Sequence, residues 1–179
     1  MTNSLSPVEA PYSPPIEAVL AQYPQQNGYI LTLFRTFANS LRFLQKCVPN
    51  LLDSESPLDL RIREITILRV TANRNCEYEW GVHVAAFSKA AKLTADQIAA
   101  TRQTISECWT VKEQRLLSAI DQLCAASTLD DNTLAAFQSD WSTEEQLEIL
   151  ALCGTYSTIS FVANVARLPP EGFAPHFPS

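Results

Sequence analysis

Apolar residues recur at intervals of three and four along most of this 179-residue chain. Ile30, Phe34, Phe37, Leu41 and Leu44 follow one another in this way, and the spacing places them on one face of an α-helix. No segment alternates apolar and polar residues as a half-buried strand does. The pattern therefore predicts an all-α protein of about eight helices, at residues 14–22, 28–47, 58–73, 76–91, 95–103, 111–127, 131–139 and 143–167.

The starts of these helices are marked by residues that can bind the free backbone amides of a first helical turn. Three starts have the capping-box pattern, a Ser or Thr followed three positions later by Glu or Gln. They are Thr94 to Gln97, Thr110 to Glu113 and Ser142 to Glu145. Two others place a serine before a proline, at Ser13-Pro14 and Ser56-Pro57. Asn75 is predicted to cap a helix that begins at Cys76.

Two predicted helices are apolar on almost every side rather than along one stripe. They run from Leu58 to Thr71 and from Leu147 to Val165. Such helices are buried on several sides, and a small all-α domain with two of them often places one in a subunit interface. Polar residues such as Thr155, Ser157 and Asn164 interrupt the second segment, which favours a buried helix over a membrane span. We therefore expect a homo-oligomer and no membrane partner.

Proline is concentrated at the ends of the chain, with most of its eleven copies in the first fifteen and last eleven residues. This distribution predicts an irregular N-terminal arm at 1–12, one helical domain at 13–167 and a proline-rich tail at 168–179 that packs as an extended arm. A chain of this length buries about 70% of its unfolded surface, so it folds without a disulfide or a metal.

Charge and cysteine content exclude several classes of protein. Lys and Arg number 13 against 19 Asp and Glu, a net charge of −6, and no basic run is present. A nucleic-acid partner is therefore not expected. The five cysteines are scattered and odd in number, unlike a secreted disulfide framework or a paired zinc site. Because the N-terminus lacks the pattern of a signal peptide, we expect a cytoplasmic protein with reduced thiols.

The residues with candidate chemistry lie within a run of twenty, and they are Glu64, Cys76, Glu79 and His83. At about 100° per residue, Cys76 and His83 share one face of their predicted helix and Glu79 lies at its edge. Glu64 lies among apolar residues of the preceding helix, where a carboxylate must be paired or protonated. Burial there would raise the pKa of Glu64 toward neutrality, as a general acid or base requires, and His83 is its natural partner. These four residues are the predicted catalytic set.

The same residues also have structural interpretations. A histidine on an apolar face is often a hydrogen-bonded core residue, and Glu64 could form an ion pair with Arg35 or Arg69. Glu79 and His83 could bind a metal together with Glu64, but a single histidine is a weak signal. No metal or cofactor is predicted, and the catalytic hypothesis depends on the combination of residues.

Cys76 is predicted to lie in the first turn of its helix. The helix dipole there lowers the pKa of a thiol and makes it more reactive. A charged Glu79 one turn further along has the opposite effect, and the spacing alone does not decide between the two.

The run from Leu60 to His83, with the segment from Ala90 to Ile98 that follows it, resembles the carboxymuconolactone decarboxylase family. That family shares its fold with alkylhydroperoxidase D. The string Cys-Glu-Tyr-Glu-Trp-Gly-x-His, at residues 76–83, is the most specific part of the likeness. The resemblance implies an all-helical fold assembled as dimers, trimers or hexamers, with the active site near subunit contacts.

In the peroxidase branch of this superfamily, a Glu twelve residues upstream serves a C-x-x-C pair and a His four residues after the second Cys. By position Glu64, Cys76 and His83 match that Glu, the first Cys and the His, whereas Glu79 occupies the position of the second Cys. The resemblance therefore implies that the usual redox disulfide cannot form. Peroxide reduction at Cys76 would need another thiol to resolve its sulfenic acid.

The decarboxylase branch, by resemblance, acts on a carboxylated unsaturated lactone without a cofactor, and its chemistry is proton transfer. Glu64, Glu79 and His83 are suitable groups for that work. An anionic substrate also needs a cation, for which the candidates are Arg61, Arg69 and Arg74. We expect a cofactor-free acid–base enzyme with a small carboxylated, lactone-type substrate. The alternatives are a peroxiredoxin-like thiol peroxidase that uses Cys76, and a non-catalytic oligomeric scaffold.

Overall fold

The computed structural model describes residues 5–26, 28–103 and 107–178; the first four residues of the predicted N-terminal arm and the last residue of the tail lie outside them. The described residues form nine helices and one short hairpin. The elements are α1 Pro14–Leu20, β1 Gln25–Gln26, β2 Tyr29–Ile30, α2 Thr32–Phe37, α3 Leu41–Lys46, α4 Leu60–Asn73, α5 Glu77–Phe87, α6 Ala95–Ala100, α7 Val111–Ala126, α8 Asp131–Asp140 and α9 Thr143–Val165. The predicted all-α class is confirmed.

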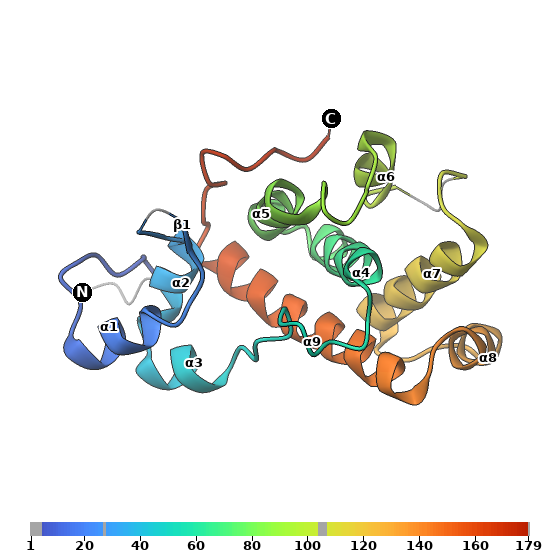
Figure 1. The fold of residues 1–179 in the computed structure, drawn as a ribbon, viewed down its shortest axis with the longest axis horizontal. Helices are drawn as coiled ribbons and strands as arrows, with labels where there is room; N and C mark the ends of the chain where they lie inside the picture. Colours follow the sequence, from blue (N-terminus) through green and yellow to red (C-terminus); the bar gives the residue numbers. More distant parts are fainter. Residues whose placement is uncertain (1–4, 27, 104–106, 179) are drawn as a thin grey trace.

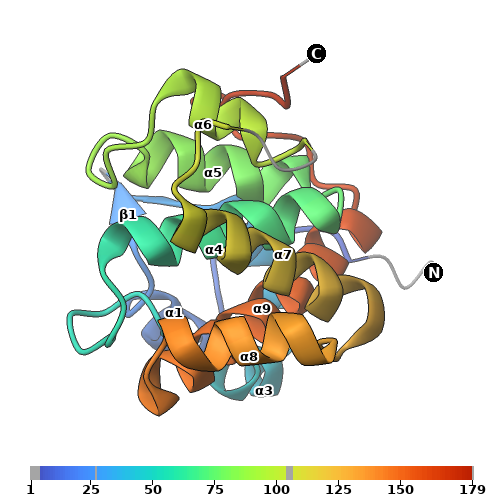
Figure 2. The same cartoon turned by 90° about the vertical axis from the view of Figure 1, so that its right-hand side faces the viewer.

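The helices are arranged around α4, which contacts α5, α7 and α9. Figure 1 shows α9 crossing the molecule, with α1 to α3 near its C-terminal half and α7 and α8 toward its N-terminal end. In Figure 2, α4 and α5 lie between α6 on one side and α8 and α9 on the other. Every residue of α4 from Ile62 to Thr71 is buried, so the predicted central helix is confirmed. This burial removes Glu64 from water.

The three predicted capping boxes are all present. In each, the side chain of the first residue accepts from the backbone amide of the fourth, and the side chain of the fourth accepts from the backbone amide of the first. The prediction of a helix start at Ser56 is wrong, because α4 begins only at Leu60, where Asp59 accepts from the amide of Ile62 at 2.8 Å. The Ser56 oxygen accepts from the Leu58 amide at 3.3 Å and its hydroxyl donates to Glu148 of α9, but no helix begins at this bond.

The single helix predicted at 28–47 is wrong as well. Its first residues form strand β2, paired with β1 through a turn in which Gly28 has a φ of 79°. The remainder is divided into α2 and α3 at Ser40, whose extended backbone (φ −139°) ends one helix and caps the next. The Asn39 amide at this break donates to the carbonyls of Thr36 and Ser6. These bonds stabilise a turn where apolar spacing alone predicts a continuous helix.

The start of α5 also differs by one residue from the prediction. Asn75 does not cap it, because its φ is 50°, and Cys76 is itself the N-cap residue, before the helix begins at Glu77. The left-handed turn at Asn75 lets the chain reverse directly between α4 and α5. The two helices therefore pack side by side with Glu64 and His83 facing one another.

The C-terminal tail packs over α5 as an extended arm, as expected (Figure 1). Glu171 accepts hydrogen bonds from the hydroxyls of Tyr78 and Tyr29 and from the Thr32 amide. The tail lies so close to α5 that a Cβ on Gly81 would approach the Pro175 carbonyl oxygen to 2.5 Å, which explains glycine there. The division of the chain into arm, domain and tail stays a prediction.

Helix α9 is long and apolar enough to cross a membrane, judged by length and composition only, with a mean hydropathy of 1.2 over 18 residues. Core helices of soluble proteins meet the same criterion, and 39% of this window is buried inside the structure. One side of α9 packs on α4, where Leu152, Tyr156 and Ile159 are buried.

Candidate active site

His83 lies between two carboxylates in the interior, one from α4 and one from its own helix. Its Nδ1 is 2.7 Å from Glu64 Oε2, and its Nε2 is 3.4 Å from Glu79 Oε1, one helical turn away. The exposed fractions are 0% for Glu64, 3% for His83 and 5% for Glu79. The expected pairing of Glu64 with His83 is confirmed. The ion pairs suggested with Arg35 and Arg69 are wrong.

The two carboxylates decide the protonation of His83. Burial alone lowers the pKa of His83, since it disfavours a charged ring, but the charges and hydrogen bonds of Glu64 and Glu79 raise that pKa to about 9. At neutral pH the ring is therefore an imidazolium that donates from Nδ1 to Glu64 and from Nε2 to Glu79. It is a buried acid held between two bases.

This protonation makes stability depend on pH. The pKa of His83 is about 9 in the folded protein and 6.5 in the reference state, so the stabilisation is complete below pH 6.5 and is lost as the pH rises through 9. The free energy of unfolding should fall by up to about 1.4 kcal/mol per pH unit in this window. Urea unfolding between pH 6 and 8.5, with a His83→Gln variant that loses this slope, checks the expectation. An equal slope in both proteins would assign the pH dependence to other groups.

Cys76 is fully buried beside this chain of residues. Burial raises the pKa of its thiol to about 11, although the backbone amide of Glu79 favours the thiolate. The charge of Glu79 adds to the effect of burial. Burial outweighs both influences weighed from the sequence, the helix start and the Glu79 charge, and the thiol stays protonated at neutral pH.

Two residues of α9 complete the site, and the sequence interpretation missed both. The Tyr156 ring packs edge-on against the ring of His83, with centroids 5.0 Å apart. Ser160 Oγ lies close enough to the Cys76 thiol to lower its pKa, yet no partner within the described part of the chain satisfies that oxygen with good hydrogen-bond geometry. Glu79 Oε2 likewise has no partner among the described residues. Buried polar atoms without partners are costly, so these two oxygens are ready to bind a water molecule or a ligand.

The cation at the site is Arg63, which the sequence interpretation also missed. Its Nε donates to Glu64 at 3.3 Å, and its guanidinium carbon lies 5.7 Å from the centre of the Phe87 ring. Its side chain is mostly buried, and Nη1 donates to the Leu52 carbonyl. Arg63 lies next to Glu64 in the sequence, so the same burial of α4 that was predicted for Glu64 could have identified it.

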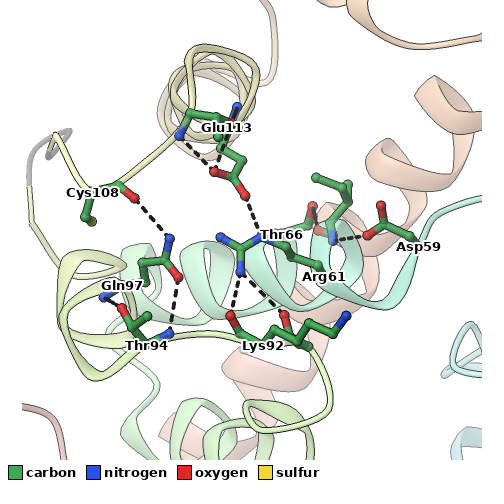
Figure 3. A network of polar contacts seen from close by, with 11 residues as sticks. Asp59, Arg61, Thr66, Lys92, Thr94, Gln97, Cys108 and Glu113 are labelled. Atoms are coloured by element: carbon green, nitrogen blue, oxygen red, sulfur yellow. Dashed lines mark hydrogen bonds and ion pairs between the residues drawn. The ribbon is translucent and has the colours of Figure 1, made fainter.

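The three arginines predicted to bind an anionic substrate have other partners. Figure 3 shows Arg61 between the Glu113 carboxylate, at 2.6 Å, and the Lys92 carbonyl, at 2.9 Å. Arg69 forms a two-point ion pair with Asp121. Arg74 donates to Ser157 and lies over the Phe161 ring. No contact joins any of the three to the four candidate residues in the described part of the chain.

The two surface grooves do not include the four candidate residues. A groove of about 450 Å³ is lined by residues on both sides of Cys76, Asn75 and Glu77, together with the C-terminal arm. A second, of about 380 Å³, lies between residues 50–57 and the start of α9. Neither is lined by the four candidate residues. Within the described residues, no group of three His, Cys, Asp or Glu side chains is placed to hold a metal ion.

Solved structures share this fold. An uncharacterized peroxidase-related protein from Silicibacter sp. TM1040 has a TM-score of 0.75 and 16% identity, over 96% of each chain. The debrominase Bmp8, solved with 2,3,4-tribromopyrrole, has a TM-score of 0.75 and 14% identity, over 97% of this chain and 94% of its own. A putative antioxidant defence protein AhpD from Agrobacterium tumefaciens has a TM-score of 0.60 and 22% identity, over 65% and 81%. At such identities these likenesses show the fold alone.

Sequence comparison identifies the part of the chain that matches a known family. A search of the curated proteins found no match. The model of the carboxymuconolactone decarboxylase family matches residues 40–122, the segment that contains Glu64, Cys76, Glu79 and His83. The resemblance drawn from the sequence is thus confirmed for this part of the chain: residues 40–122 match the carboxymuconolactone decarboxylase family, and the helical fold is similar to that of an alkylhydroperoxidase D-like protein.

Proposed function

We propose that this protein is a cofactor-free acid–base enzyme that acts on a small carboxylated substrate of the lactone type and releases carbon dioxide. The observation that carries the proposal is the buried chain Glu64–His83–Glu79, which ends in a carboxylate oxygen, Glu79 Oε2, that has no partner among the described residues. Such a chain can store a proton and deliver it at one defined atom.

The roles follow from the contacts. When the bond to the carboxylate carbon breaks, carbon dioxide leaves, the electron pair stays on the carbon skeleton, and one proton must be added to it. Imidazolium His83 is assigned to pass a proton from Nε2 to the Glu79 carboxylate, 3.4 Å away, and Glu79 is assigned to deliver a proton from its carboxyl group to the carbon skeleton. Glu64 keeps the imidazole oriented through Nδ1. A proton from solvent restores the starting state, so the reaction needs no cofactor or oxidant.

Arg63 is assigned to the electrostatic balance of the site. The charges of Glu64 and Glu79 are offset by imidazolium His83 and by Arg63, which is itself 8% exposed. Nη2 of Arg63 makes no hydrogen bond within the described part of the chain, and it is free to bind a substrate carboxylate.

A thiol peroxidase is the second candidate. The descriptions of two structural neighbours, one peroxidase-related and one a putative antioxidant defence protein, favour it. The pKa of Cys76, raised to about 11, opposes it, because the thiolate is the reactive form. The third candidate is a non-catalytic scaffold in which the same chain of residues is structural. We propose the cytoplasm as the compartment of each candidate, because the five scattered cysteines do not form the pattern of a secreted disulfide framework.

Two parallel assays separate the three candidates. Purified, reduced protein is treated with a small excess of hydroperoxide and its intact mass is measured, while carbon dioxide release is followed from a panel of carboxylated lactones. We expect carbon dioxide release that survives in a Cys76→Ser variant, and no oxygen adduct that depends on Cys76. A rapid adduct lost in Cys76→Ser would establish the peroxidase instead. If neither activity is found and no ligand shifts the melting temperature, only the non-catalytic scaffold remains.

A further inference from the structure

Helix α9 carries a regular stripe of apolar and small residues on the side away from the active site; its one hydroxyl, on Thr158, is bound to the Gly154 carbonyl. Its members follow one another at intervals of four, three, four, three and four residues. They are Leu147, Ala151, Gly154, Thr158, Phe161 and Val165, here called the outer stripe. The large members are strongly exposed, Leu147 by 64%, Phe161 by 56% and Val165 by 71%. Alternation of three and four is the spacing of a helix seam that packs against a second helix.

No contact within the described part of the chain requires glycine at position 154, at the centre of the stripe. A Cβ at this position would meet nothing within 4 Å in the described part of the chain, so neither packing nor strain requires a glycine. A glycine inside a helix destabilises it through backbone entropy. Its absent side chain does allow the backbone of another helix to approach closely.

The stripe is complementary to itself when a second copy runs antiparallel. A two-fold axis at the level of residue 156 pairs Leu147 with Val165, Ala151 with Phe161, and Gly154 with Thr158. Each small side chain then faces a larger one, as interdigitated packing requires. Parallel pairing would instead place Phe161 against Phe161 and leave a gap between two copies of Ala151. The pattern therefore fits an isologous, antiparallel contact.

The charges at the two ends of α9 favour the same orientation. Glu144 and Glu148 flank its start, beside a groove that also contains Asp53 and Glu55. Its other end is flanked by Arg167, by Arg74, whose guanidinium lies over the Phe161 ring, and by one acid, Glu77, which binds the Phe177 amide. Antiparallel pairing brings the acidic end of one copy to the basic end of the other, whereas parallel pairing brings like charges together.

We propose that the outer stripe of α9 binds the outer stripe of a second copy of this chain, antiparallel and about a two-fold axis. This interface is independent of the proposed chemistry, but it stabilises the helix whose opposite side carries Tyr156 and Ser160. The chain is thereby an isologous dimer.

Disulfide trapping tests the orientation. The double variant Leu147→Cys with Val165→Cys should form an intermolecular disulfide on mild oxidation, and each single variant should not. Positions 147 and 165 are about 27 Å apart along one helix, so the bond cannot form within a chain. Wild-type protein oxidised under the same conditions shows how much cross-linking comes from the native cysteines. Equal cross-linking of the singles, or none in the double, would overturn the antiparallel pairing.

Light scattering and sedimentation test the dimer itself. Wild type should have twice the mass of one chain, and Phe161→Asp should raise the dissociation constant at least roughly tenfold while keeping its helical circular dichroism. Val111→Asp is the matched control, because Val111 is 64% exposed on α7, outside the stripe, and its dimer should be unchanged. A monomeric wild type, or binding of wild type but not of Phe161→Asp to phosphatidylcholine vesicles, would overturn the proposal.

Discussion

Glu79→Gln is expected to lower the kcat of carbon dioxide release by roughly 100- to 10,000-fold, the usual contribution of a group that transfers a proton in the transition state. Glutamine keeps the shape and can still accept from His83 Nε2 through its oxygen, but its amide cannot take up the His83 proton and pass it to the carbon skeleton. The KM should change little, since the amide removes an acid rather than a binding contact. The measurement is a steady-state profile on whichever lactone of the panel is turned over.

Glu77→Gln is the matched control for this variant. Glu77 lies on the same helix two residues earlier, but its carboxylate accepts from the Phe177 amide of the C-terminal arm. Its substitution should leave kcat within a few-fold of wild type. If Glu79→Gln also kept that rate, Glu79 would be a structural partner of His83, and the proton would have to come from another group.

Arg69→Ala is expected to destabilise the fold by about 3 kcal/mol. This value is typical of removing one partner of a buried ion pair and leaving backbone carbonyls without a hydrogen bond. The guanidinium binds Asp121 of α7 through two bonds of 2.6 Å and the carbonyls of Thr101 and Gln103 through Nη1. Its loss leaves these carbonyls unpaired and removes polar contacts that join α4 to α7 and to the end of α6. Because the Asp121 side chain is 35% exposed, water recovers part of the cost. For a domain of this size the melting temperature should fall by roughly 6–12 °C.

Arg115→Ala provides the comparison, since it removes an arginine that also has a carboxylate partner. Arg115 lies 3.3 Å from Asp140, but its side chain is 51% exposed. Such surface pairs contribute about 0–1 kcal/mol, so little change is expected in the thermal unfolding of this variant. Arg69→Lys should recover only part of the stability, because a single ammonium cannot bind Asp121 and both carbonyls at once. Equal losses in Arg69→Ala and Arg115→Ala would contradict this account.

Sequence rules that involve only neighbouring residues predicted many of the helices correctly. Capping boxes predicted the starts of α6, α7 and α9 correctly, because a cap and its partners lie within four residues of each other. Apolar spacing predicted the all-round burial of α4. It also placed Glu64 and His83 on facing helices, since two long helices joined by a short turn must pack antiparallel.

The same rules failed where a group that is distant in the sequence binds the backbone or a capping side chain. Ser56 has the sequence of a helix start and accepts from the Leu58 amide, but its hydroxyl also binds Glu148, ninety-two residues away, and the helix begins only at Leu60. The segment 28–47 has helical spacing, but the turn at Asn39 is stabilised by the Ser6 carbonyl of the N-terminal arm. Neither partner is visible in the local pattern.

The sequence by itself thus determined the helical class, most helix starts and the residues of the acid–base chain, because each depends on contacts within one helix or between neighbours in the chain. Only the tertiary structure decided how that chain is charged and completed. Glu64 and Glu79 keep His83 protonated although burial alone would lower its pKa, and that burial needs α9, whose Tyr156 and Ser160 are about eighty residues further along the chain. The same burial raises the pKa of the Cys76 thiol; it depends on every helix packed around the group, and no local pattern records it.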